Sequence, residues 1–249
     1  MLFYGLLLLS FLIAAVVFST LFFIKAPYGR YIQRTWGPLI FNNLGWLLME
    51  SPAALFFACC FVIGSNPKTL TLWAFLLMWE AHYIHRAFIY PFQIADGHKK
   101  MPIVVMLFGM IFNSFNAYLN GQYLFSLSPS YPNTWLYDPR FLAGMGLFIT
   151  GFAINRWSDH ILRSLRLPGE TGYRIPYGGL FQWISCPNYL GEIIEWCGWA
   201  LATWSLPGLS FALWTIANLV PRARSHHAWY RSHFPDYPQQ RKAMIPRVW

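Results

Sequence analysis

The amino-acid sequence predicts an all-α polytopic membrane protein with seven transmembrane helices, an outside or lumenal N-terminus and a cytoplasmic C-terminus. The chain is 56% hydrophobic and 20% aromatic but only 11% charged, which leaves too little polar surface for a soluble domain of 249 residues. Several apolar runs reach the roughly 20 residues that a helix needs to cross a bilayer. No internal repeat or linker divides the chain, so residues 1–249 are expected to form a single integral-membrane domain.

Seven apolar segments mark the predicted spans. The first lacks the basic n-region and cleavage site of a signal peptide and is longer than an h-region, so it is expected to remain as a helix. The predicted spans cover residues 2–24, 39–63, 69–94, 101–125, 139–155, 179–203 and 205–220. A polar helix, 156–166, should continue the fifth span, and a basic, aromatic tail should begin at Arg222.

The positions of the basic residues predict the orientation. Loops after the first, third and fifth spans, together with the C-terminal tail, hold 16 of the 18 Lys and Arg residues when Arg86 is grouped with the third loop. The opposite side holds only Lys68 and Arg140. Basic residues prefer cytoplasmic loops, which places the tail in the cytoplasm. This distribution argues against a nucleic-acid partner despite the net charge of +9, and we expect the endoplasmic reticulum membrane in a eukaryote or the inner membrane in a bacterium.

Residues 155–196 form an unusually polar stretch for a membrane protein. Polar and ionisable groups are costly in a membrane and often mark functional sites. Arginines beside a span often only set topology, but that explanation does not cover the amides and carboxylates Asn155, Asp159, Asn188, Glu192 and Glu195. Arginine suits phosphate, and carboxylates and amides suit ribose hydroxyls and a carboxamide. The combination favours a phosphorylated nucleotide, although the sequence contains no GxGxxG motif or P-loop.

A second polar set lies deeper in the predicted spans: Glu50, Glu80, Tyr83, His85, Arg86 and the asparagines Asn113, Asn116 and Asn120. The three asparagines share one helix face, which should point toward other helices or a cavity. Interhelical hydrogen bonds are a purely structural explanation for such residues. His82 and His85 have no obvious third ligand, so no metal is predicted. The intervals between the four cysteines match neither a metal site nor a disulfide framework. We therefore expect them to be small buried hydrophobic residues.

Three blocks of sequence carry a resemblance: NRWSDHILRSLRLPGETGYRIPYGGLF, PNYLGEIIEWCGWALATWSLP and FPDYPQQRKAMIP. Together with AHYIHRAFIY and the Trp46–Glu50 pair, they resemble the steroid 5α-reductase family, whose members are 3-oxo-5α-steroid 4-dehydrogenases, and the type 2 form in particular. The match covers most of the chain from residue 46 onward. The first helix and the 91–100 loop match weakly.

This resemblance implies an oxidoreductase that transfers a hydride from NADPH to a 3-oxo-Δ4 steroid. The implied pair that polarises the carbonyl falls on Glu50 and Tyr83, while Trp46 and Asn116 are assigned to substrate binding. The implied cofactor contacts fall on Tyr28, Asn155, Asp159, Arg166, Tyr173, Arg174, Asn188, Glu192, Arg222, His226 and Tyr230. The steroid would enter from the lipid phase and NADPH from the cytoplasm; the oligomeric state stays open, and a monomer is compatible with the sequence.

Enone chemistry agrees with this assignment. Hydride addition at the β-carbon sends negative charge to the ketone oxygen, and one well-placed donor typically lowers such a barrier by about 3–4 kcal/mol. Tyr83 can be that donor, and Glu50 can donate as a neutral acid or orient the phenol. Two alternatives remain: an isoprenylcysteine-type methyltransferase, which would use S-adenosylmethionine without phosphate-binding arginines, and a sterol or lipid transporter, which the absence of repeated broken helices disfavours.

Overall fold

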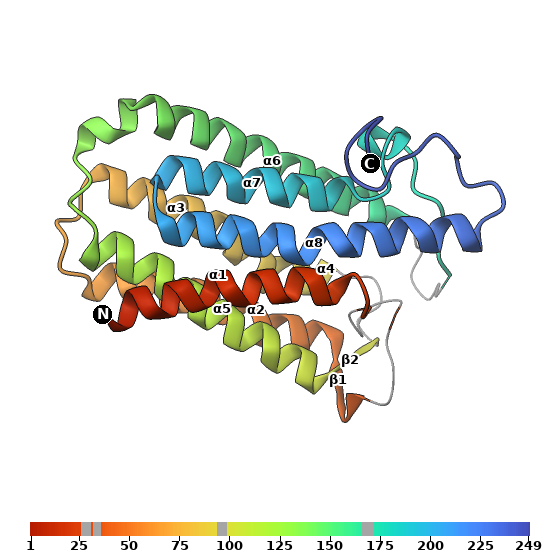
Figure 1. Cartoon of the computed structure of the whole chain (residues 1–249), viewed down its shortest axis with the longest axis horizontal. Coiled ribbons are helices and arrows are strands. Elements are labelled where there is room, and N and C mark those ends of the chain that lie inside the picture. The colour runs from red at the N-terminus through yellow and green to blue at the C-terminus, as the bar shows by residue number, and fades with distance from the viewer. Residues whose placement is uncertain (26–30, 32–35, 94–98, 166–171) are drawn as a thin grey trace. The chain divides into compact units, whose positions relative to one another are not determined.

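The computed structural model describes residues 1–25, 31, 36–93, 99–165 and 172–249. These residues are mostly helical (Figure 1). The chain divides into two compact units, and we describe each separately. Unit 1 combines Met1–Ala26 with Ala143–Trp249, and unit 2 comprises Pro27–Leu142.

Unit 2 is built around a long contact between two apolar helices, α2 and α5, with α3 packed beside α2. A short antiparallel ladder joins β1 to β2 and pairs Leu39 with Pro102. The elements of this unit are β1 (Leu39–Phe41), α2 (Asn42–Ile63), α3 (Leu70–Ile84), the π-helical turn η3 (His85–Ile89), α4 (Tyr90–Gln93), β2 (Lys100–Pro102), α5 (Ile103–Gln122), the π-helical turn η4 (Tyr123–Leu127) and the 3₁₀ turn η5 (Asn133–Tyr137).

Aromatic packing and local caps explain why these helices hold together. Phe57 of α2 stacks on Trp79 of α3 with ring centroids 4.3 Å apart, and the Trp79 indole N–H donates to the Ala53 carbonyl at 3.0 Å. The Thr69 side chain accepts from the Leu72 N–H at 3.3 Å, which satisfies one of the free amides at the start of α3. The core of unit 2 is therefore apolar, with the polar residues described below set into it.

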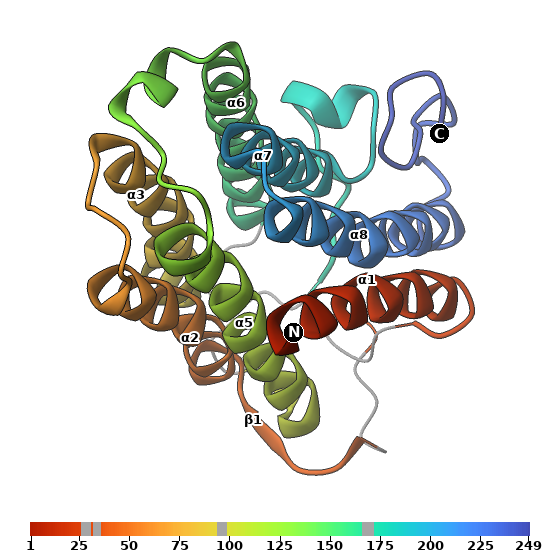
Figure 2. The same cartoon turned by 60° about the vertical axis from the view of Figure 1, so that its left-hand side comes forward.

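The described residues of unit 1 form four α-helices and the 3₁₀ turn η6 (Gly179–Gln182). The α-helices are α1 (Leu2–Leu21), α6 (Pro139–Ser164), which begins just before the unit boundary, α7 (Pro187–Thr203) and α8 (Leu206–His233). Figures 1 and 2 show α8 lying between α1 and α7. Ser10 of α1 and Ser210 of α8 share a buried hydrogen bond of 2.8 Å. A hydroxyl pair of this kind can join helices in a membrane, where the polar groups have few other partners.

Four glycines bring α6 and α7 into close backbone contact. Gly144 and Gly151 of α6 are seven residues apart, as are Gly191 and Gly198 of α7, and each pair faces the other. A Cβ atom added at any of the four would collide with backbone atoms of the facing helix. Small residues allow this approach between membrane helices, so the interface depends on the absence of side chains at these positions.

Among the described residues, three segments are long and apolar enough to cross a membrane: Leu2–Leu21, Asn42–Ile63 and Ile103–Leu127. They correspond to the first, second and fourth predicted spans. The helical, integral-membrane character of the chain is therefore supported, while the number of seven spans, the orientation and the single-domain organisation stay predictions.

Several predicted boundaries are wrong. The predicted spans 39–63 and 101–125 begin as strands, because residues 39–41 pair with residues 100–102, and their helices start only at Asn42 and Ile103. In the predicted span 179–203, residues Gly179–Gln182 form only the 3₁₀ turn η6, and the long helix begins at Pro187. The backbone N–H groups of Ser185 and Cys186 donate to the Lys242 and Ala243 carbonyls, which interrupts the helix between the two elements. Proline is well suited to a first helical position, since its missing N–H would have no partner there. The tail predicted from Arg222 is instead helical as far as His233, and buried Ala223 and Tyr230 anchor that extension.

Candidate active site

Four of the predicted cofactor residues form one connected polar network on α6 and α7. Asn155 and Asp159 lie four residues apart on α6 and are buried, with 6% and 5% of their surface exposed. Asn155 Nδ2 donates to the Asn188 carbonyl at 3.0 Å and approaches Glu192 Oε2 at 3.5 Å. Asn188 Nδ2 in turn donates to Asp159 Oδ1 at 3.2 Å. The close glycine contact between α6 and α7 brings these side chains within reach of one another.

A second cluster joins α7 to α8 through Tyr189, which is not among the predicted site residues. The Tyr189 hydroxyl lies 3.1 Å from His226 Nε2 and accepts from Arg222 Nη2 at 3.3 Å. Arg222 also donates to Asn218 Oδ1 at 3.2 Å. Burial lowers the pKa of Arg222 to about 9, so this guanidinium is still positively charged at neutral pH. Tyr189 follows Asn188 directly in the chain, but only the packing of α7 on α8 reveals its two partners.

Three of the remaining predicted cofactor residues lie in the described part of the chain. Tyr230 is buried and stacks on Tyr237 with ring centroids 5.3 Å apart. Tyr173 contacts Trp229 edge to face at 5.0 Å, and Arg174 is exposed. Tyr28 and Arg166 lie outside the described residues. Unit 1 thus gathers amides, carboxylates, a half-buried arginine and aromatic rings on α6, α7, α8 and the segment before α7.

In unit 2, Glu50 is buried within α2, with 8% of its surface exposed. Asn113 of α5 donates from Nδ2 to Glu50 Oε2 at 3.0 Å and to the Met49 carbonyl at 2.8 Å. Arg86 lies on the π-helical turn η3 and places Nε 3.8 Å from Glu50 Oε1. In the sequence, Asn113 and Arg86 stand out only as polar residues within predicted spans, with no predicted role. Their contacts with Glu50 are tertiary, since the three residues come from different elements.

Tyr83 and Trp46 occupy aromatic surroundings in the same unit. Tyr83 is 3% exposed, and its ring lies 5.0 Å from the rings of both Trp79 and His82. The Trp46 ring lies under the Arg86 guanidinium, at 4.5 Å, and meets Tyr90 edge to face at 5.6 Å. Turns of π-helix often occur at functional sites, and here such a turn carries the cation that links Glu50 to Trp46.

Asn116 carries an unused hydrogen-bond donor. It is 5% exposed, and its Oδ1 and backbone carbonyl accept from Asn120 Nδ2, each at 3.1 Å. Among the residues that the structure describes, nothing accepts from Asn116 Nδ2. A buried donor without an acceptor costs free energy, so this atom is a candidate contact for a polar group of a ligand.

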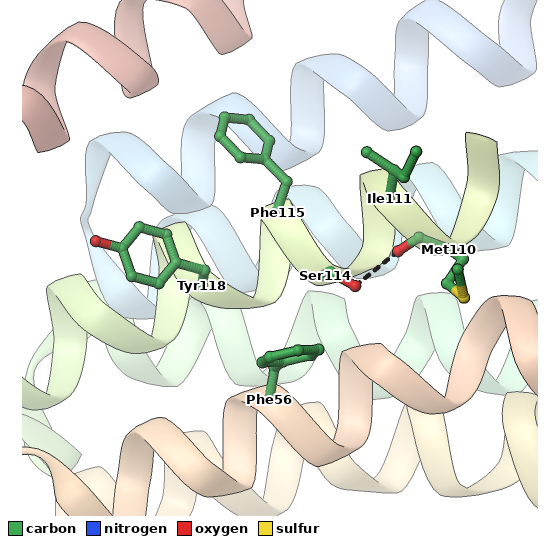
Figure 3. Close-up of a pocket in the computed structure, with 6 residues that line it drawn as sticks. All are labelled: Phe56, Met110, Ile111, Ser114, Phe115 and Tyr118. Carbon is green, nitrogen blue, oxygen red and sulfur yellow. Dashed lines mark hydrogen bonds between the residues drawn. The ribbon is translucent and has the colours of Figure 1, made fainter. Parts of the chain in front are cut away.

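An apolar groove of about 410 Å³ lies on another face of α5, toward α2 (Figure 3). Its lining comprises Phe56, Met110, Ile111, Ser114, Phe115 and Tyr118. None of the predicted catalytic or substrate residues lines it, because Asn113, Asn116 and Asn120 occupy the buried face of α5. In the part of the chain that is described, no group of three or more His, Cys, Asp or Glu residues could hold a metal ion.

Comparison with known proteins identifies the class to which this fold and these polar clusters belong. The family model of 3-oxo-5-alpha-steroid 4-dehydrogenases matches residues 99–249. The Bos taurus protein 3-oxo-5-alpha-steroid 4-dehydrogenase 1 is 44% identical over 94% of this chain and 92% of its own length. The Gossypium hirsutum protein Steroid 5-alpha-reductase DET2 is 41% identical over 100% of this chain and 98% of its own length. The Homo sapiens protein 3-oxo-5-alpha-steroid 4-dehydrogenase 1 is 42% identical over 89% of this chain and 86% of its own length.

These similarities define a helical membrane oxidoreductase that acts on a CH–CH group. The chain belongs to the 3-oxo-5-alpha-steroid 4-dehydrogenase family, which confirms the predicted family. The particular resemblance to the type 2 form stays a prediction. The roles of individual residues stay predictions.

Proposed function

We propose that this protein reduces the Δ4 double bond of 3-oxo-Δ4 steroids to 5α-reduced 3-oxo steroids, with NADPH as the hydride donor. The observation that supports this most directly is the buried polar cluster around Glu50 in an otherwise apolar helical unit. Such a cluster is costly in a membrane unless it has a partner or a task. NADPH-dependent formation of the saturated ketone by membranes containing the protein tests the proposal, and binding of S-adenosylmethionine instead of NADPH would contradict it.

In unit 2 the proposed task is to stabilise charge on the ketone oxygen. Reduction of a conjugated enone transfers negative charge to that oxygen, and a fixed donor stabilises the transition state more than the ground state. Tyr83 supplies the donor in this proposal. Asn113 and Arg86 hold the Glu50 carboxyl group, whose Oε2 acts as an acceptor toward Asn113. This arrangement favours Glu50 as the group that orients the phenol rather than as a free neutral acid.

The steroid itself needs a largely apolar site with few polar contacts. Trp46 offers an aromatic face, and the free donor of Asn116 can meet a polar substituent. We infer that the steroid reaches these residues from the lipid phase, because the steroid skeleton and the lipid interior are both apolar. The proposal requires no second subunit and is compatible with a monomer in the endoplasmic reticulum membrane or a bacterial inner membrane.

In unit 1 the donor set fits NADPH. When bound, this cofactor supplies the hydride for the reaction. The Asn155–Asn188 network offers amide and carboxylate groups for ribose hydroxyls and a carboxamide, and Tyr173 and Tyr230 offer aromatic faces. Arg174 and Arg222, with His226, offer positive or hydrogen-bonding groups for phosphate oxygens, a role that suits arginine forks. Tyr28 and Arg166 complete the proposed set.

Arg174→Ala should raise the KM for NADPH by roughly tenfold or more, because a charge-assisted hydrogen bond contributes about 1.5–3 kcal/mol. The KM for the steroid and the kcat should change little, since Arg174 belongs to the proposed cofactor set. Arg247→Ala is the matched control, because Arg247 is also exposed and cationic but belongs to neither proposed set. An unchanged KM for NADPH in Arg174→Ala would remove this residue from the cofactor site.

The predicted orientation has its own test. Single cysteines introduced at Lys68 and Gly172 of a cysteine-free variant should react with membrane-impermeant reagents from opposite sides of sealed vesicles. The Gly172 position should label from the cytoplasmic side, where NADPH is available. Labelling of both positions from one side would contradict the seven-span arrangement.

A further inference from the structure

A groove of about 370 Å³ lies in unit 1 between the end of α1 and the C-terminal half of α8. Lys25, Arg224 and His233 contribute basic groups to its lining, and Ser232 contributes a hydroxyl. No carboxylate occurs among the described residues that line it. The groove therefore has a positive potential that suits an anion, and two lysine or arginine side chains carry that charge at neutral pH.

The walls of the groove are apolar and aromatic. Phe22, just after α1, and Trp229 of α8 both line it. The Arg224 guanidinium lies 5.6 Å from the Phe22 ring centroid, and Trp229 stacks on His233 with ring centroids 4.1 Å apart. A free inorganic anion gains nothing from such walls, whereas a molecule with both an anionic group and an apolar chain can use both surfaces.

The position of the groove along the helices points to the same kind of molecule. Phe22 and Lys25 directly follow α1, which is long and apolar enough to cross a membrane. Arg224 follows the predicted span 205–220 within α8. Basic and tryptophan side chains at such positions lie at the level of lipid headgroups, and basic groups there attract anionic lipids.

The groove is distinct from the proposed cofactor residues on the same helix. Arg222, His226 and Tyr230 follow one another at intervals of four and share one face of α8. Ser225 and Ser232 are seven residues apart and line the groove from a different face. Trp229 is the point of contact between the two faces, because its ring also touches Tyr173.

We propose that this groove binds the headgroup of an anionic phospholipid. The phosphate group lies against Lys25 and Arg224, while an acyl chain packs along Phe22. The site is independent of the proposed catalytic function, since none of these residues belongs to the proposed steroid or cofactor sets. It ties the ends of α1 and α8 to the surface of the bilayer.

Native mass spectrometry of the full-length protein in detergent tests this proposal with phosphatidylglycerol and phosphatidylcholine of the same acyl composition. The parent should retain one phosphatidylglycerol in preference to phosphatidylcholine. Lys25→Gln with Arg224→Gln should weaken retention of phosphatidylglycerol by about 30-fold, and Lys25→Gln alone by about fivefold. Both side chains are exposed, so the thermal unfolding of the variants should match that of the parent.

The control variant Lys68→Gln with Arg247→Gln removes the same charge from exposed positions outside the groove and should retain the lipid like the parent. An equal loss of phosphatidylglycerol retention in this control would show that the effect depends on net charge alone, and it would contradict the proposed site. Equal retention of phosphatidylcholine by the parent would overturn headgroup recognition. Displacement of the lipid by inorganic phosphate at the same concentration would assign the site to a free anion instead of a lipid.

Discussion

Tyr83→Phe should lower the rate of enone reduction by roughly a hundredfold or more, as expected for removal of one donor to a developing oxyanion. The substitution removes a hydroxyl and almost no volume, and the ring contacts with Trp79 and His82 can persist. NADPH affinity should therefore stay near that of the parent, and the loss should appear in kcat. The measurement is NADPH-dependent conversion of a 3-oxo-Δ4 steroid to its saturated product in membranes.

Tyr118→Phe is the matched control, because Tyr118 belongs to the same unit but lines the apolar groove on another face of α5 (Figure 3). It should leave the rate of reduction near that of the parent. If Tyr83→Phe also reacted like the parent, the Tyr83 hydroxyl would serve only to join helices. Glu50→Gln should reduce kcat as well, by less than Tyr83→Phe, since the amide keeps an oxygen that can accept from Asn113 but loses the charge near Arg86.

Gly151→Ala should destabilise the protein by about 3 kcal/mol or more, because overpacking of a close interface typically costs 1–3 kcal/mol and here the obstacle is backbone. The new Cβ atom would collide with the backbone of Gly191 and Glu195 on α7. Separation of α6 from α7 would also part Asn155 from the Asn188 carbonyl. Thermal unfolding in detergent and the KM for NADPH measure the two consequences.

Gly146→Ala provides the comparison within the same helix. A Cβ atom at Gly146 meets nothing within 4 Å among the described residues, and alanine favours a helix over glycine by up to about 1 kcal/mol. The Tm of Gly146→Ala should therefore equal or exceed that of the parent. Equal Tm values for Gly151→Ala and Gly146→Ala would contradict the close contact of α6 and α7.

The composition and local patterns of the sequence were sufficient for the class of the protein and for much of its candidate site. Long apolar runs predicted the membrane helices at Leu2–Leu21 and Asn42–Ile63, because length and hydropathy are properties of a single segment. Helical spacing placed Asn113, Asn116 and Asn120 on one face of α5, and the structure buries that face. Long, specific blocks of sequence were sufficient to predict the family.

Contacts between helices were decided only by the tertiary structure. Asn113 and Arg86 approach Glu50 from elements far apart in the chain, and Tyr189 meets Arg222 and His226 only through the packing of α7 on α8. Local patterns also misplaced several boundaries. Strand pairing delays α2 and α5, backbone hydrogen bonds to the C-terminal segment delay α7, and buried anchors extend α8 to His233. Sequence spacing determines which residues share a helix face, but the partner of each face depends on how helices pack, as the glycines that join α6 to α7 illustrate.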